Sequence, residues 1–175
     1  MKIIKTNFKD LIIVKNVSYR DNRGYFKELM RENNFKKKFP FIVMSYSKKN
    51  VVRGLHLQIK EAQGKFVSVI KGKIFDVALD LRKNSKTFGK HFKVILSEKN
   101  GKHLFVPRGF AHGILGLDKE NILHYACSNY RDSKSEVSIK WNDPDLKINW
   151  GTKKPIISKK DKFALSLKDF KKNIR

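Results

Sequence analysis

Five short stretches of the sequence carry side chains that could bind a small molecule or transfer a proton. The first is the run Arg53-Gly54-Leu55-His56-Leu57-Gln58. If this run is a strand, alternation places Gly54, His56 and Gln58 on one face and the two Leu on the other. An imidazole and an amide on one face, with a glycine leaving room beside them, suit a small-molecule pocket. The alternative is a hydrogen-bonded structural His, which is the commoner role of an isolated His.

The second and third stretches combine glycine with basic side chains. Gln63-Gly64-Lys65 predicts a tight turn with Lys65 at the entry to a strand, although a lone Lys is more often a solvated surface group. Residues 107–113, Pro-Arg-Gly-Phe-Ala-His-Gly, place His112 in what we expect to be a loop or strand-entry corner. The five His form no His-x-His or His-x-x-x-His pair, so we expect neither a metal nor another cofactor.

The last two stretches supply a phenol and a carboxylate. Within residues 122–130, alternation puts Leu123, Tyr125 and Cys127 on one face. Tyr125 then either offers its hydroxyl inside the fold or packs in the core with that hydroxyl bound to backbone. Ser158-Lys159-Lys160-Asp161 is typical of a helix start capped by its serine. Asp161 either completes this cap or reaches a His and orients it.

Short β-prone runs between turn signals must position these side chains, a pattern typical of an all-β sandwich or barrel. Strands are expected at 11–14, 41–46, 51–57, 66–70, 73–81, 92–96, 103–107, 122–128 and 137–141. Along 73–81, Phe75, Val77 and Leu79 share one face, so we expect this strand to separate a packed layer from a polar lumen or solvent. Helices are expected only at 27–36 and within 160–173. We therefore predict an all-β barrel or jelly roll with short helices, as a single domain over residues 1–175.

Composition narrows the class of protein further. The chain has 175 residues, of which 40% are hydrophobic, and this excludes a mainly disordered chain. It has one Cys, no apolar run long enough to span a membrane, and no signal-peptide pattern at its start, so we expect a soluble, cytoplasmic protein. The net charge of +24 could indicate nucleic-acid binding. Because the Lys residues are spread along the whole chain and Arg is scarce, we expect no dedicated nucleic-acid partner, but attraction of a phosphate-bearing small ligand.

Taken together, these stretches resemble the dTDP-4-dehydrorhamnose 3,5-epimerase family of nucleotide-sugar enzymes. Seven pieces match in the family's order and with similar spacing: residues 21–28, 53–58, 63–65, 72–82, 107–113, 141–144 and 158–161. The resemblance implies a cupin-type jelly roll that works as a homodimer without metal.

The resemblance also implies the reaction and the residues that perform it. The substrate is a nucleoside-diphospho-4-keto-6-deoxy sugar, most simply dTDP-linked, whose C3 and C5 protons leave to form an enolate with the C4 carbonyl. His56 matches the family's general base and Asp161 the carboxylate that orients it. Tyr125 matches the acid on the opposite face of the ring, and Lys65 the cation beside the C4 oxygen. The residues implied to hold the diphosphate and sugar are Arg23, Glu28, Arg53, His112, Glu136 and Lys160.

Two departures from the family pattern lie near the implied ligand. The family's Gln-x-Asn element before the Arg-Gly-Leu-His segment is missing from residues 41–46, Phe-Ile-Val-Met-Ser-Tyr. The stretch from His56 to Lys65 is one residue shorter than the common form and lacks its Pro. Two alternatives therefore stay open: an epimerase that inverts a single centre of a related deoxy sugar, and a basic cupin that binds without turnover.

Overall fold

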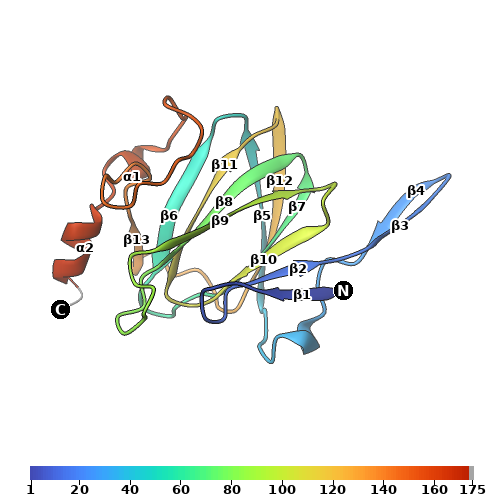
Figure 1. The fold of residues 1–175 in the computed structure, drawn as a ribbon, viewed down its shortest axis with the longest axis horizontal. Coiled ribbons are helices and arrows are strands. Elements are labelled where there is room, and N and C mark those ends of the chain that lie inside the picture. The colour runs from blue at the N-terminus through green and yellow to red at the C-terminus, as the bar shows by residue number, and fades with distance from the viewer. Residues whose placement is uncertain (174–175) are drawn as a thin grey trace.

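Strands dominate the fold of this chain, for which a computed structural model describes residues 1–173 (Figure 1). The strands are β1 (Lys2–Lys5), β2 (Ile12–Lys15), β3 (Ser18–Asp21), β4 (Gly24–Lys27), β5 (Phe41–Lys48), β6 (Val52–Gln58), β7 (Lys65–Lys71), β8 (Lys73–Asp80), β9 (His91–Ser97), β10 (Lys102–Val106), β11 (Phe110–Gly116), β12 (Glu120–Cys127) and β13 (Glu136–Ser138). The helices are the 3-10 turn η1 (Glu32–Asn34), α1 (Lys159–Lys162) and α2 (Leu167–Asn173). None of the helices in this part of the chain has the length and apolar character needed to cross a membrane.

Two antiparallel sheets form the body of the molecule. One has six strands in the order β1-β2-β10-β7-β12-β5, and the other has five in the order β13-β6-β11-β8-β9. The apolar cluster that includes Val67, Leu104, Ile114 and Leu123 takes its side chains from strands of both sheets. This arrangement confirms the predicted jelly-roll barrel with short helices at its edge.

Strand β8 is packed on both faces, which differs from the expectation of one polar face. Val77 and Leu79 pack in a cluster with Trp150 and Phe170 of the C-terminal segment, whereas Ile74 belongs to the cluster shared by the two sheets. The C-terminal segment thus covers the outer side of the five-stranded sheet. The strand's carboxylates, Asp76 and Asp80, are fully buried and each has polar partners.

The predicted helix at 27–36 is wrong, because the hairpin β3–β4 extends to Lys27 and only η1 (Glu32–Asn34) is helical within this range. The side-chain amide of Asn16 donates to the carbonyl oxygens of Glu28 and Leu29, at 2.6 and 2.9 Å. Phe35 and Phe39 pack on the outer face of the six-stranded sheet with Phe66 and other apolar side chains. These tertiary contacts hold the segment in place of a helical hydrogen-bond ladder.

The turn at Arg108 and Gly109 leads directly into β11, so of the two alternatives for this stretch the strand-entry corner is confirmed, and His112 is the third residue of the strand. The turn ends at Gly109, and His112 pairs with His56 across the β6–β11 ladder. The ladder shifts register beyond this pair, where Gly54 has φ +125°. A Cβ on Gly54 would lie 2.6 Å from the Cα of Gly113, so only glycine permits this close approach. The bulge fixes which residues of the two strands face each other beside the cavity.

Candidate active site

A cavity of about 590 Å³ lies between the two sheets and receives most of the side chains singled out above. Its walls come from both sheets, from the loop before β13 and from the segment that leads into α1. Eight of the ten predicted site residues line it: His56, Tyr125, Lys65, Asp161, Arg53, His112, Glu136 and Lys160.

His56 and Asp161 form a close pair on the five-stranded-sheet side of the cavity. The distance between His56 Nε2 and Asp161 Oδ1 is 2.6 Å. Asp161 lies in α1, where Ser158 caps the helix by accepting from the Asp161 backbone N–H at 3.1 Å and donating to its Oδ2 at 2.9 Å. Burial opposes ionisation of Asp161, but the contact with His56 and the hydrogen bond from Ser158 hold the pKa of this carboxyl below its usual value. Asp161 therefore both takes part in the Ser158 cap and contacts an imidazole, which joins the two alternatives that the sequence left open.

Tyr125 and Lys65 lie on the opposite sheet, on the neighbouring strands β12 and β7. The Tyr125 hydroxyl accepts a long hydrogen bond, 3.4 Å, from Ser45 Oγ of β5. Burial raises the pKa of Tyr125 to about 12, so its phenol stays protonated at neutral pH. Burial lowers the pKa of Lys65, a shift that Cys127 and the carboxylates of Glu136 and Asp76 only partly offset. This wall thus offers a proton donor and a cation that has been partly stripped of water.

Two further side chains are held by partners behind the cavity wall. His112 Nε2 lies 2.9 Å from both carboxylate oxygens of the fully buried Asp76. Arg53 donates from Nε to Ser47 Oγ at 2.9 Å and from a terminal nitrogen to the Tyr46 carbonyl at 2.8 Å. These contacts fix both side chains and leave the second ring nitrogen of His112 and the other N–H groups of Arg53 for a ligand.

Glu136 lies at the centre of a charged group at the edge of the cavity. Its carboxylate binds Lys160 Nζ at 2.9 Å and a terminal nitrogen of Arg131 at 3.0 Å, and it lies 3.8 Å from His56 Nδ1. Burial opposes its ionisation, but the hydrogen bonds from Lys160 and Arg131 hold the pKa of Glu136 below its usual value. The carboxylate is therefore charged at neutral pH.

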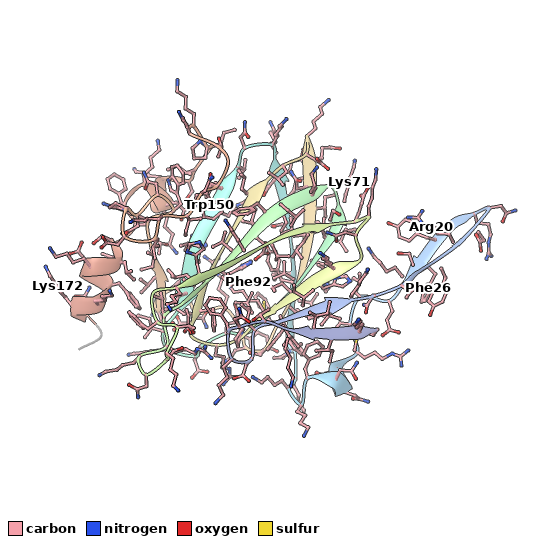
Figure 2. The ribbon with its side chains drawn as sticks, viewed as in Figure 1. Arg20, Phe26, Lys71, Phe92, Trp150 and Lys172 are labelled. Atoms are coloured by element: carbon pink, nitrogen blue, oxygen red, sulfur yellow. The ribbon has the colours of Figure 1, made fainter. Side chains whose placement is uncertain are left out.

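Arg23 and Glu28 are not brought to this cavity. The hairpin β3–β4 that carries Arg23 projects from the body as an arm, and Figure 2 shows Arg20 and Phe26 on it, away from the strands that enclose the cavity. Arg23 binds Asp21 at 2.6 Å and Glu28, just after the arm, binds Arg31 at 2.7 Å. Within one chain, both are surface residues.

Several lining residues were not among the sequence-based candidates, and they differ in whether a signal existed. Arg131 stands out as one of the few Arg residues, five positions before Glu136, and this scarcity could have identified it. Phe41 and Val43 were noted only as the strand that lacks the Gln-x-Asn element, and the structure places both in the cavity wall. Ser45 carried no signal, because a single Ser in a strand is unremarkable in sequence. Within residues 1–173, no three His, Cys, Asp or Glu side chains are grouped so that they could hold a metal ion.

Comparison with known proteins identifies the family of this chain. A family model for dTDP-4-dehydrorhamnose 3,5-epimerase matches residues 5–169. The enzyme of that name from Methanothermobacter thermautotrophicus is 43% identical over 169 residues, 92% of this chain and 91% of its own. A Legionella pneumophila dTDP-6-deoxy-D-glucose-3,5-epimerase, solved with dTDP-4-keto-L-rhamnose, superposes with a TM-score of 0.92 at 38% identity, covering 95% and 93% of the two chains.

A third relative has a narrower activity in its name. The 3'-monoepimerase of Streptomyces bikiniensis, solved with dTDP-quinovose, superposes with a TM-score of 0.90 at 26% identity and covers 96% of this chain and 89% of its own. The extent of the sequence match and the shared jelly roll lead to one conclusion. The chain is an isomerase that belongs to the dTDP-4-dehydrorhamnose 3,5-epimerase family.

Proposed function

We propose that the protein epimerises a dTDP-linked 4-keto-6-deoxy sugar at C3 and C5 by proton transfer through an enolate. The observation that carries this proposal is the division of the cavity between the two sheets. The His56–Asp161 pair lies on one side, and the Tyr125 phenol and Lys65 ammonium lie on the other. A flat sugar ring held between them meets a base on one face and an acid on the other, as inversion of a carbon centre requires.

The contact with Asp161 selects the nitrogen of His56 that acts as the base. Because the Asp161 carboxylate accepts the proton on Nε2, the lone pair resides on Nδ1. Nδ1 takes the proton from C3 or C5, and the C–H electron pair moves into the ring to leave negative charge on the C4 oxygen. Lys65 stabilises that oxygen, and Asp161 stabilises the imidazolium.

Tyr125 completes the inversion by giving its proton to the other face of the same carbon. The electron pair of the enolate forms the new C–H bond, the C4 carbonyl returns, and the phenol becomes a phenolate. Proton exchange with solvent then restores the neutral His56 and the phenol for the second centre. A phenol whose pKa is raised to about 12 donates only to a strongly basic partner, and an enolate carbon is such a partner.

Binding of the diphosphate falls to the basic side chains at the cavity. Arg53, Lys160 and Arg131 line it together with His112, and a guanidinium donates to phosphate oxygens in pairs. The apolar Phe41 and Val43 form part of the wall where the family has amides, so this part of the ligand is held by packing.

We propose further that the chain works as a homodimer, in the cytoplasm, with its arm against the second copy. The arm exposes large apolar side chains, with Tyr19 67%, Tyr25 50% and Phe26 71% exposed, and the edge strand β5 exposes Met44 at 70%. A second copy that covered these side chains would also give Arg23 and Glu28 a ligand to bind, in the partner's cavity. Light scattering should give the mass of a dimer.

A single-centre epimerase is the second candidate, supported by the likeness to the Streptomyces monoepimerase and by the altered wall at Phe41 and Val43. One experiment separates all the candidates. Incubation with dTDP-4-keto-6-deoxyglucose in deuterated water should place deuterium at both C3 and C5, whereas a monoepimerase labels one centre. A binding module labels neither while it still binds dTDP.

The base is tested by His56→Ala, which should abolish exchange and leave the unfolding temperature close to that of the parent. His91→Ala, which removes an imidazole on β9 outside the cavity, should keep full activity. Normal exchange in the His56→Ala protein would refute the proposed chemistry.

A further inference from the structure

The carboxylate of Glu136 is shared by three groups that the proposed reaction needs for other purposes. One oxygen binds Lys160 at 2.9 Å and lies 3.8 Å from His56 Nδ1, and the other binds Arg131 through two nitrogens, at 3.0 and 3.2 Å. Lys160 and Arg131 are two of the cations available for a diphosphate. His56 Nδ1 is the atom that takes the proton. Glu136 therefore links the binding end of the site to the base.

Glu136 and its two cationic partners differ in how freely their side chains can move. The side chains of Arg131 and Lys160 are 63% and 45% exposed, whereas that of Glu136 is 13% exposed. Glu136 is also fixed at its backbone, because β13 pairs with β6 and places Glu136 opposite Gln58. When a diphosphate enters, the two long basic side chains can turn to it while the carboxylate keeps its place beside His56.

The imidazole of His56 has a carboxylate beside each of its two nitrogens. Of these two carboxylates, Glu136 is the one paired with cations. Asp161 contacts Nε2 directly, while the charge of Glu136 beside Nδ1 is balanced by Lys160 and Arg131. Removing these cations would expose the developing imidazolium to the full negative charge of Glu136. A nearby opposite charge favours the charged form of a titrating group.

We propose that Glu136 competes with the substrate diphosphate for Arg131 and Lys160, and that their transfer to the diphosphate frees its charge to stabilise protonated His56. This inference rests on the proposed function and deepens it. Glu136 is then a positioning residue that strengthens the base only when the nucleotide part of the substrate is bound. Its competition for the two cations weakens binding of the nucleotide.

For Glu136→Gln, a change that keeps the shape of the side chain and removes its charge, we expect tighter nucleotide binding together with slower exchange. The Kd for dTDP should fall by about threefold to tenfold, the range expected when two partly exposed ion pairs no longer compete. The kcat for deuterium exchange should fall by about tenfold or more, because the imidazolium loses one of its two carboxylates. If Glu136 instead held the substrate directly, the same variant would bind dTDP more weakly and raise KM.

Calorimetry with dTDP and the exchange assay, both on the full chain, measure the two effects. Glu120→Gln is a matched control, because Glu120 binds Lys71 at 2.6 Å on the surface outside the cavity, and it should change neither quantity. Glu136→Asp keeps the charge and should recover part of kcat. Tighter dTDP binding with lower kcat supports the proposal, provided that the unfolding temperature stays near the parent's.

Weaker dTDP binding in the Glu136→Gln protein, or an unchanged kcat, would overturn the coupling and leave the epimerase function intact. Failure of the parent protein both to bind dTDP and to exchange deuterium would overturn the proposed function, and the coupling with it.

Discussion

Replacing Asp161 with Asn removes one negative charge from beside the imidazole of His56 while the side chain keeps its shape. Asp161 is 3% exposed, and its Oδ1 lies 2.6 Å from His56 Nε2. Once His56 has taken a proton, this carboxylate faces a full positive charge. Two unit charges about 4 Å apart attract by about 4 kcal/mol at an effective dielectric constant of about 20.

The partial exposure of the imidazole sets the size of the expected effect. Its side chain is 25% exposed, and water there weakens the attraction. We therefore expect the variant to lose about 3 to 4 kcal/mol of transition-state stabilisation, a fall in kcat of about 100- to 1000-fold. The KM should change little, because the charge that Asp161 stabilises develops only during the reaction.

A matched control separates the loss of charge from the loss of a helix cap. Asp169 is the third residue of α2, as Asp161 is of α1: its backbone N–H donates to Ser166 Oγ at 3.0 Å, and that hydroxyl donates to its carboxylate at 2.6 Å. Asp169→Asn should thus show the effect of disturbing such a cap on the unfolding temperature, and it should leave kcat unchanged. The assay is deuterium exchange at C3 and C5, followed by NMR. A folded Asp161→Asn protein whose kcat is within about threefold of the parent's would refute the role of this carboxylate.

Three further changes test other parts of the site and the fold. Tyr125→Phe should keep deuterium exchange at a substantial rate while net inversion slows at least about 100-fold, because the base still works without the acid; inversion at the parental rate would mean another donor. Burial lowers the pKa of Lys65, so its charge is lost at a lower pH than that of an exposed Lys, whereas Tyr125, at about 12, titrates later. The alkaline fall of kcat/KM should therefore move to higher pH in Lys65→Arg, and an unmoved profile would contradict this assignment. Burial opposes ionisation of Asp80, but hydrogen bonds from Arg82 and two hydroxyls lower its pKa to about 2, so the stability it contributes is present above its unfolded pKa, about 4, and is lost as the pH falls towards 2. Asp80→Asn should lower the free energy of unfolding by about 2 kcal/mol at pH 7, and chemical denaturation should show this difference shrinking below pH about 4.

The strands and the serine cap before α1 could be anticipated from short-range patterns. Alternation along 51–57 and 122–128 predicted which side chains share a face, and His56 and Tyr125 do line the cavity. The serine cap before Asp161 was equally readable, because a cap depends on residues three positions apart. These features are local, so the order of side chains along the chain is enough to define them.

The failures in the N-terminal third have a common cause in contacts between distant residues. The segment 27–36 has a composition that a helix accepts, but the amide of Asn16 binds the carbonyls of Glu28 and Leu29. Nothing within 27–36 indicates that its carbonyls will be used in this way. The pairing of His112 with His56 also depends on distant residues, since Gly54 and Gly113, far apart in sequence, allow β6 and β11 to approach closely.

By itself, the sequence determined the class of fold, the residue types available for proton transfer and the resemblance that names their chemistry. Only the tertiary structure decided which of them meet: it set His56 between two carboxylates, gave Arg131 a place in the site and left Arg23 on an arm outside it. The physical reason is that alternation determines on which face of a strand a side chain lies but not which strand lies beside it. Pairing, bulges and the packing of the C-terminal segment bring residues 56, 136 and 161 together, and these depend on contacts that span most of the chain.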